Sequence, residues 1–173
     1  MALSIAVREE QPVDIAAIRM IHEQAFGERD EADIVDGLRQ AGEEVISLVA
    51  MVDGQVVGHI LFSPVVIESA RRPVVGMGLG PLAVLPDYQQ QGIGSRLVQA
   101  GLEIVKKGTC PFIIVLGHAD YYPRFGFQRA STHGIYSQWA DAPEEDFMLL
   151  ILDMLVMRGV SGLARYHSIF GGT

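Results

Sequence analysis

Residues 89–94 read Gln89-Gln90-Gln91-Gly92-Ile93-Gly94 and stand between two segments of different character. An apolar run that ends at Pro86 precedes them, and the pattern of an amphipathic helix begins at Ile93. The first N–H groups of a helix have no partner within it and carry partial positive charge. A phosphate approaches such groups closely where glycine provides no Cβ. The stretch therefore predicts a strand, a turn and a helix that together bind a phosphate-bearing ligand.

Apolar spacing and turn residues predict the other elements. We expect strands over 4–8, 45–52, 55–62, 74–85, 112–116, 126–129 and 147–156, and helices over 12–26, 31–40, 93–107 and 119–125. The pair Asp53-Gly54 predicts a hairpin, and 64–68 continues or bulges from its second strand. The glycine-rich segment 159–173 fits no single element. The order predicts one α/β domain over residues 1–173 with a mixed sheet, antiparallel in its first half, and a parallel crossover through the helix 93–107.

Composition excludes several classes of protein. The 173 residues are 49% hydrophobic and 20% charged, and the formal net charge of −8 argues against nucleic acid and membrane surfaces as partners. The single cysteine, Cys110, excludes an internal disulfide and fits a reducing compartment. The N-terminus lacks a signal-peptide pattern, and the longest apolar run, 148–156, is too short to cross a bilayer. We expect a cytoplasmic protein.

The glycine turn matches neither of two common phosphate loops. A Walker A loop would place Gly-Lys-Ser/Thr at the start of the helix, whereas Lys107-Gly108-Thr109 lies at its far end. A dinucleotide fingerprint would need a third glycine at Leu97 and an acidic residue for the ribose, and neither is present.

The extended segment 82–97 resembles the GNAT superfamily of acyl-CoA-dependent N-acetyltransferases. The family signature Gln/Arg-x-x-Gly-x-Gly/Ala, after a strand that ends in Val-x-Pro, matches Gln89, Gly92 and Gly94 after Val84 and Pro86. A second family element, Tyr-x-x-x-Gly-Phe, matches Tyr122, Gly126 and Phe127. The resemblance covers residues 45–130, approximately. Within the family, the sequence is similar to a bacterial branch whose substrates are generally not established.

This resemblance implies the GNAT fold, in which the central mixed sheet is splayed between two strands, and acetyl-CoA as co-substrate without a metal. The turn would bind the pyrophosphate of coenzyme A through Gln89, Gln90, Gln91, Gly92, Ile93, Gly94 and Ser95. The backbone of Leu82, Ala83 and Val84 would face the pantetheine, whose two amides an open strand edge can satisfy. Glycines at 76, 78 and 80 permit a bulge that would open such a gap.

By the same resemblance, Tyr122 is expected to be the catalytic residue that donates a proton to the departing thiolate. The alternative for Tyr122 is simple packing against the sheet, the role expected for Tyr121. His118 could contact coenzyme A, take a proton from the amine through water, or cap the following helix. Glu23 and Glu28, near the turn at Phe26-Gly27 that should border the acceptor pocket, are candidate bases, but ordered water could also serve and neither is assigned.

The expected activity is direct transfer of the acetyl group to a primary amine of a small-molecule or peptide acceptor, because no cysteine stands in the motifs to carry it. The other histidines, His22, His59, His133 and His167, lack the spacing of metal ligands. A homodimer is possible. Two alternatives stay open: a non-catalytic module that binds or senses acyl-CoA, and an α/β protein that binds nucleotides at the same helix.

Overall fold

The computed structural model describes residues 3–171 and divides the chain into two compact units. The first unit comprises the chain up to Phe62 together with Pro81–Ile104, and the second comprises Ser63–Gly80 together with the residues from Val105 on. Three elements contribute residues to both units: β3 (Gln55–Glu68), β4 (Pro73–Val84) and α3 (Ile93–Lys106).

The first unit is built on an antiparallel sheet. Strand β1 (Ile5–Glu9) pairs with β2 (Ile46–Val52), and β2 pairs with β3 across the predicted hairpin turn. Asp53 and Gly54 have φ of 50° and 76°, the positive values that a two-residue turn of this kind needs. Between β1 and β2 lie η1 (Pro12–Asp14), α1 (Ile15–Phe26) and α2 (Asp30–Gln40).

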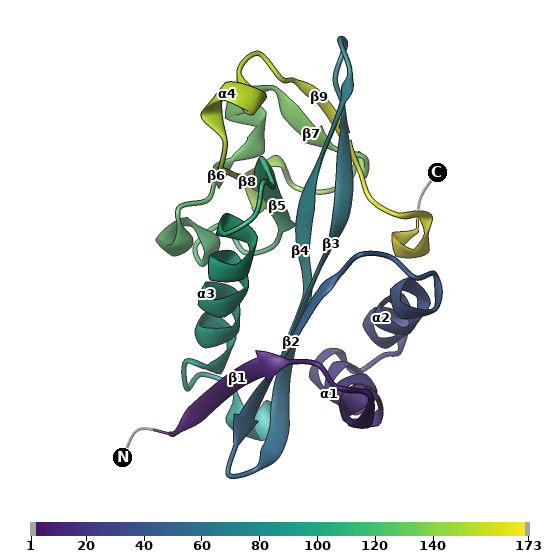
Figure 1. The fold of residues 1–173 in the computed structure, drawn as a ribbon, viewed down its shortest axis with the longest axis vertical. Helices are drawn as coiled ribbons and strands as arrows, with labels where there is room; N and C mark the ends of the chain where they lie inside the picture. The colour runs from purple at the N-terminus through teal and green to yellow at the C-terminus, as the bar shows by residue number, and fades with distance from the viewer. Residues whose placement is uncertain (1–2, 172–173) are drawn as a thin grey trace. The chain divides into compact units, whose positions relative to one another are not determined.

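Helices cover both faces of this sheet, with α1 and α2 on one side and α3 on the other (Figure 1). The alternation of β3 explains the arrangement. His59 faces α1, where its Nδ1 atom lies 2.8 Å from Nε2 of His22. Gly58 faces α3, because a Cβ there would stand 3.1 Å from Leu97. The predicted apolar face of α3 is confirmed in the first unit, where its buried side chains are Ile93, Leu97, Val98 and Leu102.

The second unit contains a mixed sheet. Residues Met77–Leu79 of β4 pair in parallel with Ile113–Val115 of β5 (Phe112–Leu116), as the crossover through α3 predicts. β5 pairs with β8 (Phe147–Ile151), which also pairs with β6 (Gln128–Arg129). β7 (Ile135–Ser137) runs parallel to β9 (Gly162–Arg165), and β9 pairs with the end of β3. The shorter elements are η3 (Tyr122–Phe125), η4 (Ala130–His133), η5 (Glu144–Asp146), α4 (Met154–Met157) and η6 (Ser168–Phe170).

Two expectations in the second unit are wrong. The strand expected over 147–156 ends at Ile151, because Oδ1 of Asp153 accepts the N–H groups of Leu155 at 3.0 Å and Val156 at 3.1 Å and so starts α4. The helix expected over 119–125 is only the 3₁₀ turn η3. Strands β7 and β9 were not predicted. No helix among residues 3–171 is long and apolar enough to cross a membrane.

The glycines of β4 serve two different purposes. A Cβ on Gly76 would overlap Phe112, and one on Gly78 would press on Val65 and Tyr166, so both glycines allow close packing within the second unit. Only Gly80 of the three has positive φ, at 136°. The irregularity expected along 76–80 is therefore confined to Gly80, and the splaying of the sheet stays a prediction.

Candidate functional site

The turn before α3 is held by its own glutamine side chains. After β4 the chain passes through η2 (Pro86–Tyr88). Nε2 of Gln89 donates to the carbonyl of Val84 at 3.0 Å, and Nε2 of Gln91 donates to the carbonyl of Asp87 at 3.3 Å. Gln89 was expected among the ligand-binding residues, and the structure gives its side chain the task of fixing the turn.

The main chain of this turn is in an uncommon conformation. Gln90 has φ of 61° and Gly92 has φ of 84°, both in the left-handed region. For a residue with a side chain, this region costs about 1–2 kcal/mol, and such strain concentrates at ligand sites. A Cβ at Gly92 would meet no atom within 4 Å, so space is open above the turn. A ligand could therefore approach the main chain at Gly92.

Helix α3 begins directly behind this turn. Arg96 N–H donates to the carbonyl of Gly92 at 3.1 Å, the first bond of the helix. The N–H groups of Ile93 and Gly94 precede that bond and belong to the end of the helix where positive partial charge gathers. The first turn of α3 holds no acidic residue. The structure thus brings together a glycine turn and a helix N-terminus that suit an anion.

The expected pantetheine-facing segment lies in the same unit. Ala83 is buried, whereas Leu82 and Val84 are half-buried. Leu85 N–H donates to the carbonyl of Val57 at 2.8 Å, which keeps the end of β4 beside β3. The Val84 carbonyl, one of the groups expected to face the pantetheine, already accepts the Gln89 amide.

In the second unit, Tyr122 is packed by the residues that follow β5. Its ring lies against Gly117, where a Cβ would overlap it, and makes edge-to-face contacts with Tyr121 and Phe127. Burial raises the pKa of the Tyr122 hydroxyl above its ordinary value, so the group holds its proton at neutral pH. The hydroxyl is thus available as a hydrogen-bond donor, and the catalytic role of Tyr122 stays a prediction.

His118 and Tyr121 have main-chain and packing contacts. The carbonyl of His118 accepts the N–H groups of Tyr121 at 3.0 Å and Tyr122 at 3.4 Å, so its main chain closes the turn, while its side chain is exposed. Arg124 lies 4.4 Å from the centre of the Tyr121 ring. The N-cap residue of η3 is Tyr121, and the three roles open to His118 stay predictions.

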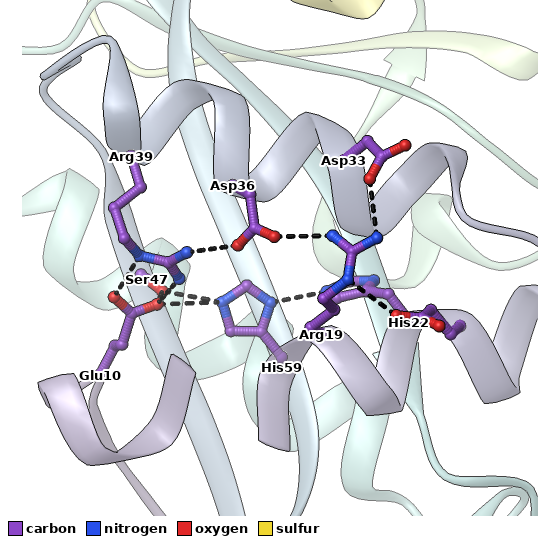
Figure 2. Close-up of polar contacts among 9 residues, drawn as sticks. Glu10, Arg19, His22, Asp33, Asp36, Arg39, Ser47 and His59 are labelled. Atoms are coloured by element: carbon purple, nitrogen blue, oxygen red, sulfur yellow. Dashed lines mark hydrogen bonds and ion pairs between the residues drawn. The ribbon is translucent and has the colours of Figure 1, made fainter. Parts of the chain in front are cut away.

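Sequence reasoning missed a buried polar network in the first unit (Figure 2). His22 and His59, both fully buried, join through Ser47 to Glu10, which forms an ion pair with Arg39 at 2.7 Å. Farther out, Arg19 contacts Glu23, Asp33 and Asp36. A signal was present, because each histidine occupies a position in an otherwise apolar face. Among residues 3–171, no group of three or more His, Cys, Asp or Glu side chains could hold a metal ion.

The chain resembles known proteins over nearly its whole length. The Acetyltransferase (GNAT) domain matches residues 43–129. The Escherichia coli protein "Uncharacterized N-acetyltransferase YhbS" is 35% identical over 95% of this chain and 97% of its own. The crystal structure of YhbS in complex with CoA has a TM-score of 0.91 at 34% identity, covering 99% of this chain and 94% of that one. The crystal structure of a GNAT family acetyltransferase of Brucella melitensis in complex with acetyl-CoA has a TM-score of 0.77 at 37% identity. The match covers 96% of this chain and 98% of that one.

These matches and the mixed sheet flanked by helices define the class of the protein, an acyltransferase with the GNAT fold. The chain belongs to the GNAT family of N-acetyltransferases.

Proposed function

We propose that this protein transfers the acetyl group of acetyl-CoA to a primary amine. The observation that carries the proposal is the turn at 89–92, where Gln90 and Gly92 are left-handed and the space at Gly92 is open directly before α3. Crystal structures of two relatives at 34% and 37% identity contain CoA or acetyl-CoA. We assign the pyrophosphate to the main chain of 90–95 and the pantetheine to that of 82–84.

The proposed reaction is a direct transfer. The amine nitrogen bonds to the thioester carbon, the carbon–sulfur bond breaks, and the thiolate takes the proton of the Tyr122 hydroxyl while the amine loses a proton to water. Cys110 supports this route over an acyl-enzyme, because burial raises the pKa of its thiol and so disfavours the reactive thiolate. The net charge of −8 favours a cationic acceptor over an anionic one.

The deciding experiment is calorimetric titration with acetyl-CoA, followed by a thiol-release assay over a panel of small amines and peptide N-termini. We expect saturable binding and release of CoA with at least one amine class. Absence of binding at millimolar acetyl-CoA would refute the proposal. Binding without turnover on any amine would favour the sensing module, and equal binding of ADP, which lacks the pantetheine, would favour a nucleotide-binding protein.

Three further assignments belong to this proposal. We propose that residues 1–173 act as one domain, that the protein works in the cytoplasm, and that two copies can pair. The lone cysteine supports a reducing compartment. Light scattering at several protein concentrations tests the pairing, and a single mass equal to one chain throughout would refute it.

A further inference from the structure

Figure 2 shows the contacts of the histidine network, and the donors and acceptors present assign a direction to each of its hydrogen bonds. The Glu10 carboxylate, contacted by Arg39, is an acceptor, so the Ser47 hydroxyl donates to its Oε1 atom at 2.8 Å. Ser47 Oγ then accepts a hydrogen bond from Nε2–H of His59, at 2.7 Å. In the neutral His59 ring, Nδ1 is left as an acceptor.

The same reasoning fixes the second ring. His59 Nδ1 accepts from Nε2–H of His22 at 2.8 Å, which leaves the lone pair of the neutral His22 ring on Nδ1. That atom is buried and has no hydrogen-bond partner among the described residues. Both rings are 0% exposed. With both rings neutral, each ring N–H group of the pair has an acceptor, and only the lone pair on His22 Nδ1 goes unpaired.

A proton added to His59 would break the chain of hydrogen bonds, and a proton added to His22 would leave a buried donor unpaired. A charged imidazole donates through both nitrogens. Protonation of His59 would therefore turn its Nδ1 atom into a donor, and this N–H group would oppose the Nε2–H group of His22. A protonated His22 would hold a buried N–H group at Nδ1 without an acceptor. Burial accordingly lowers the pKa of His22 to about 4 and that of His59 well below its ordinary value.

The charged groups around the pair do not reverse this preference. Asp36 on α2 favours a charged His22, and Asp14 at the end of η1 favours a charged His59, but Arg39 opposes charge on His59. The charged side chains that form hydrogen bonds or ion pairs around the pair are Arg8, Glu10, Asp14, Arg19, Glu23, Asp33, Asp36 and Arg39.

The pair joins α1 to the strand that supports the proposed coenzyme A segment. His22 lies in α1 and His59 in β3, and the 2.8 Å bond from Leu85 N–H to the Val57 carbonyl ties the end of β4 to β3 two residues before His59. The segment 82–84 precedes Leu85 directly. A shift of α1 against β3 is thus transmitted to the backbone that would face the pantetheine.

We propose that His22 and His59 are positioning residues of the coenzyme A site, which hold α1 on β3 while both rings are neutral and release it when either is protonated. This inference rests on the proposed function for its effect on coenzyme A. It makes binding sensitive to acid through two residues that touch neither the ligand nor the reacting atoms.

The test compares the wild type with the double variant His22→Gln/His59→Gln, because glutamine can donate and accept as the neutral rings do but does not titrate. Calorimetry would measure the Kd for CoA from about pH 7.5 down to about pH 3.5, a range that passes the lowered pKa of His22, about 4. We expect the wild-type Kd to rise at least about threefold more than that of the double variant. Because CoA has the same charge at each pH in both titrations, its own protonation does not affect the comparison. The control variant His133→Gln changes an exposed histidine outside the network, and its Kd should depend on pH as that of the wild type does.

Hydrogen exchange over residues 15–26 at each pH separates this inference from the proposed function. We expect wild-type α1 to lose protection in acid relative to the double variant at the same pH, whether or not CoA binds. Equal pH dependence of exchange in the two proteins would overturn the inference. If the double variant does not fold, imidazole nitrogen NMR of the wild type decides: two neutral Nε2–H rings near pH 6 support the inference, and a charged ring there overturns it.

Discussion

Gly101 of α3 lies directly over the ring of Phe62 of β3, so closely that a Cβ at Gly101 would overlap the ring edge. Helix and strand are in contact at this point because the helix residue has no side chain. The contact sets the distance between α3 and the first-unit sheet, and with it the position of the turn at the start of the helix.

The first prediction concerns this contact. Gly101→Ala should lower the free energy of unfolding by about 1–3 kcal/mol through overpacking, although alanine is the better helix former. Urea unfolding measures the change. Gly108→Ala, where a Cβ would make only an ordinary contact, should be nearly neutral, and Phe62→Leu should reduce the cost of Gly101→Ala. A stabilising Gly101→Ala would show that the helix can move away from the strand freely.

The second prediction concerns the turn. Gly92→Ala should cost about 1–2 kcal/mol of stability because φ is 84°, and should also weaken CoA binding because the new Cβ stands in the open space above the turn. Gly42→Ala has a matching φ of 70° and equally open surroundings, but lies after α2. Calorimetry should separate the two variants. Equal affinity for CoA would mean that the ligand does not approach Gly92.

The third prediction concerns the phenol of Tyr122. Tyr122→Phe keeps the ring that packs on Gly117 and removes only the hydroxyl, so kcat should fall by about 10²-fold or more while the Kd for CoA stays the same. Tyr121→Phe, which keeps the ring that contacts Arg124 and Phe125, is the matched control and should retain activity. A fully active Tyr122→Phe variant would leave Tyr122 with a packing role alone.

The fourth prediction follows from the lowered pKa of His22, about 4 in the folded state against 6.5 in the unfolded chain. Between these values the unfolded chain binds more protons, so stability falls as pH decreases from about 6.5 to about 4 and then levels off for this group. The loss amounts to about 3 kcal/mol for His22 alone. Denaturant unfolding across that range measures it.

A control is available for the same experiment. The hydrogen bond from Arg8 lowers the pKa of Asp14, so the stability lost through this carboxyl appears only at lower pH, below the histidine range. Asp14→Asn should therefore leave the slope between about pH 6.5 and 4 unchanged, while His22→Gln should flatten it. A wild type with constant stability over that range would contradict the buried neutral pair.

The spacing of apolar residues and the turn residues in the sequence predicted the elements that bury one continuous face. The 3.6-residue spacing of α3 and the turn at Asp53-Gly54 are complete within a few neighbouring residues, so both could be predicted from sequence. The pairing of β7 with β9 could not, because each strand has only three or four residues and the partners lie far apart in the chain. Asp153 interrupts an apolar run that otherwise resembles one strand, and its cap was missed for that reason.

The candidate site likewise contains features that the sequence predicted and features that it did not. The glycine turn was predictable because its chemistry is carried by consecutive residues. The side-chain role of Gln89 was not, since a glutamine before a helix can face a ligand or its own backbone. The histidine pair required two residues from different elements, 37 positions apart, to meet in space.

The pairing of β9 with β3 has a consequence for how the protein is made. Glu68 and Arg165, which form an ion pair at 2.5 Å between these strands, are separated by 97 residues. On a ribosome that adds 5–20 residues per second, the end of β3 would wait about 5–20 s for its neighbour to be synthesised. During that interval its unpaired edge is available to other chains, which makes the nascent polypeptide, rather than the finished enzyme, the form most in need of a chaperone.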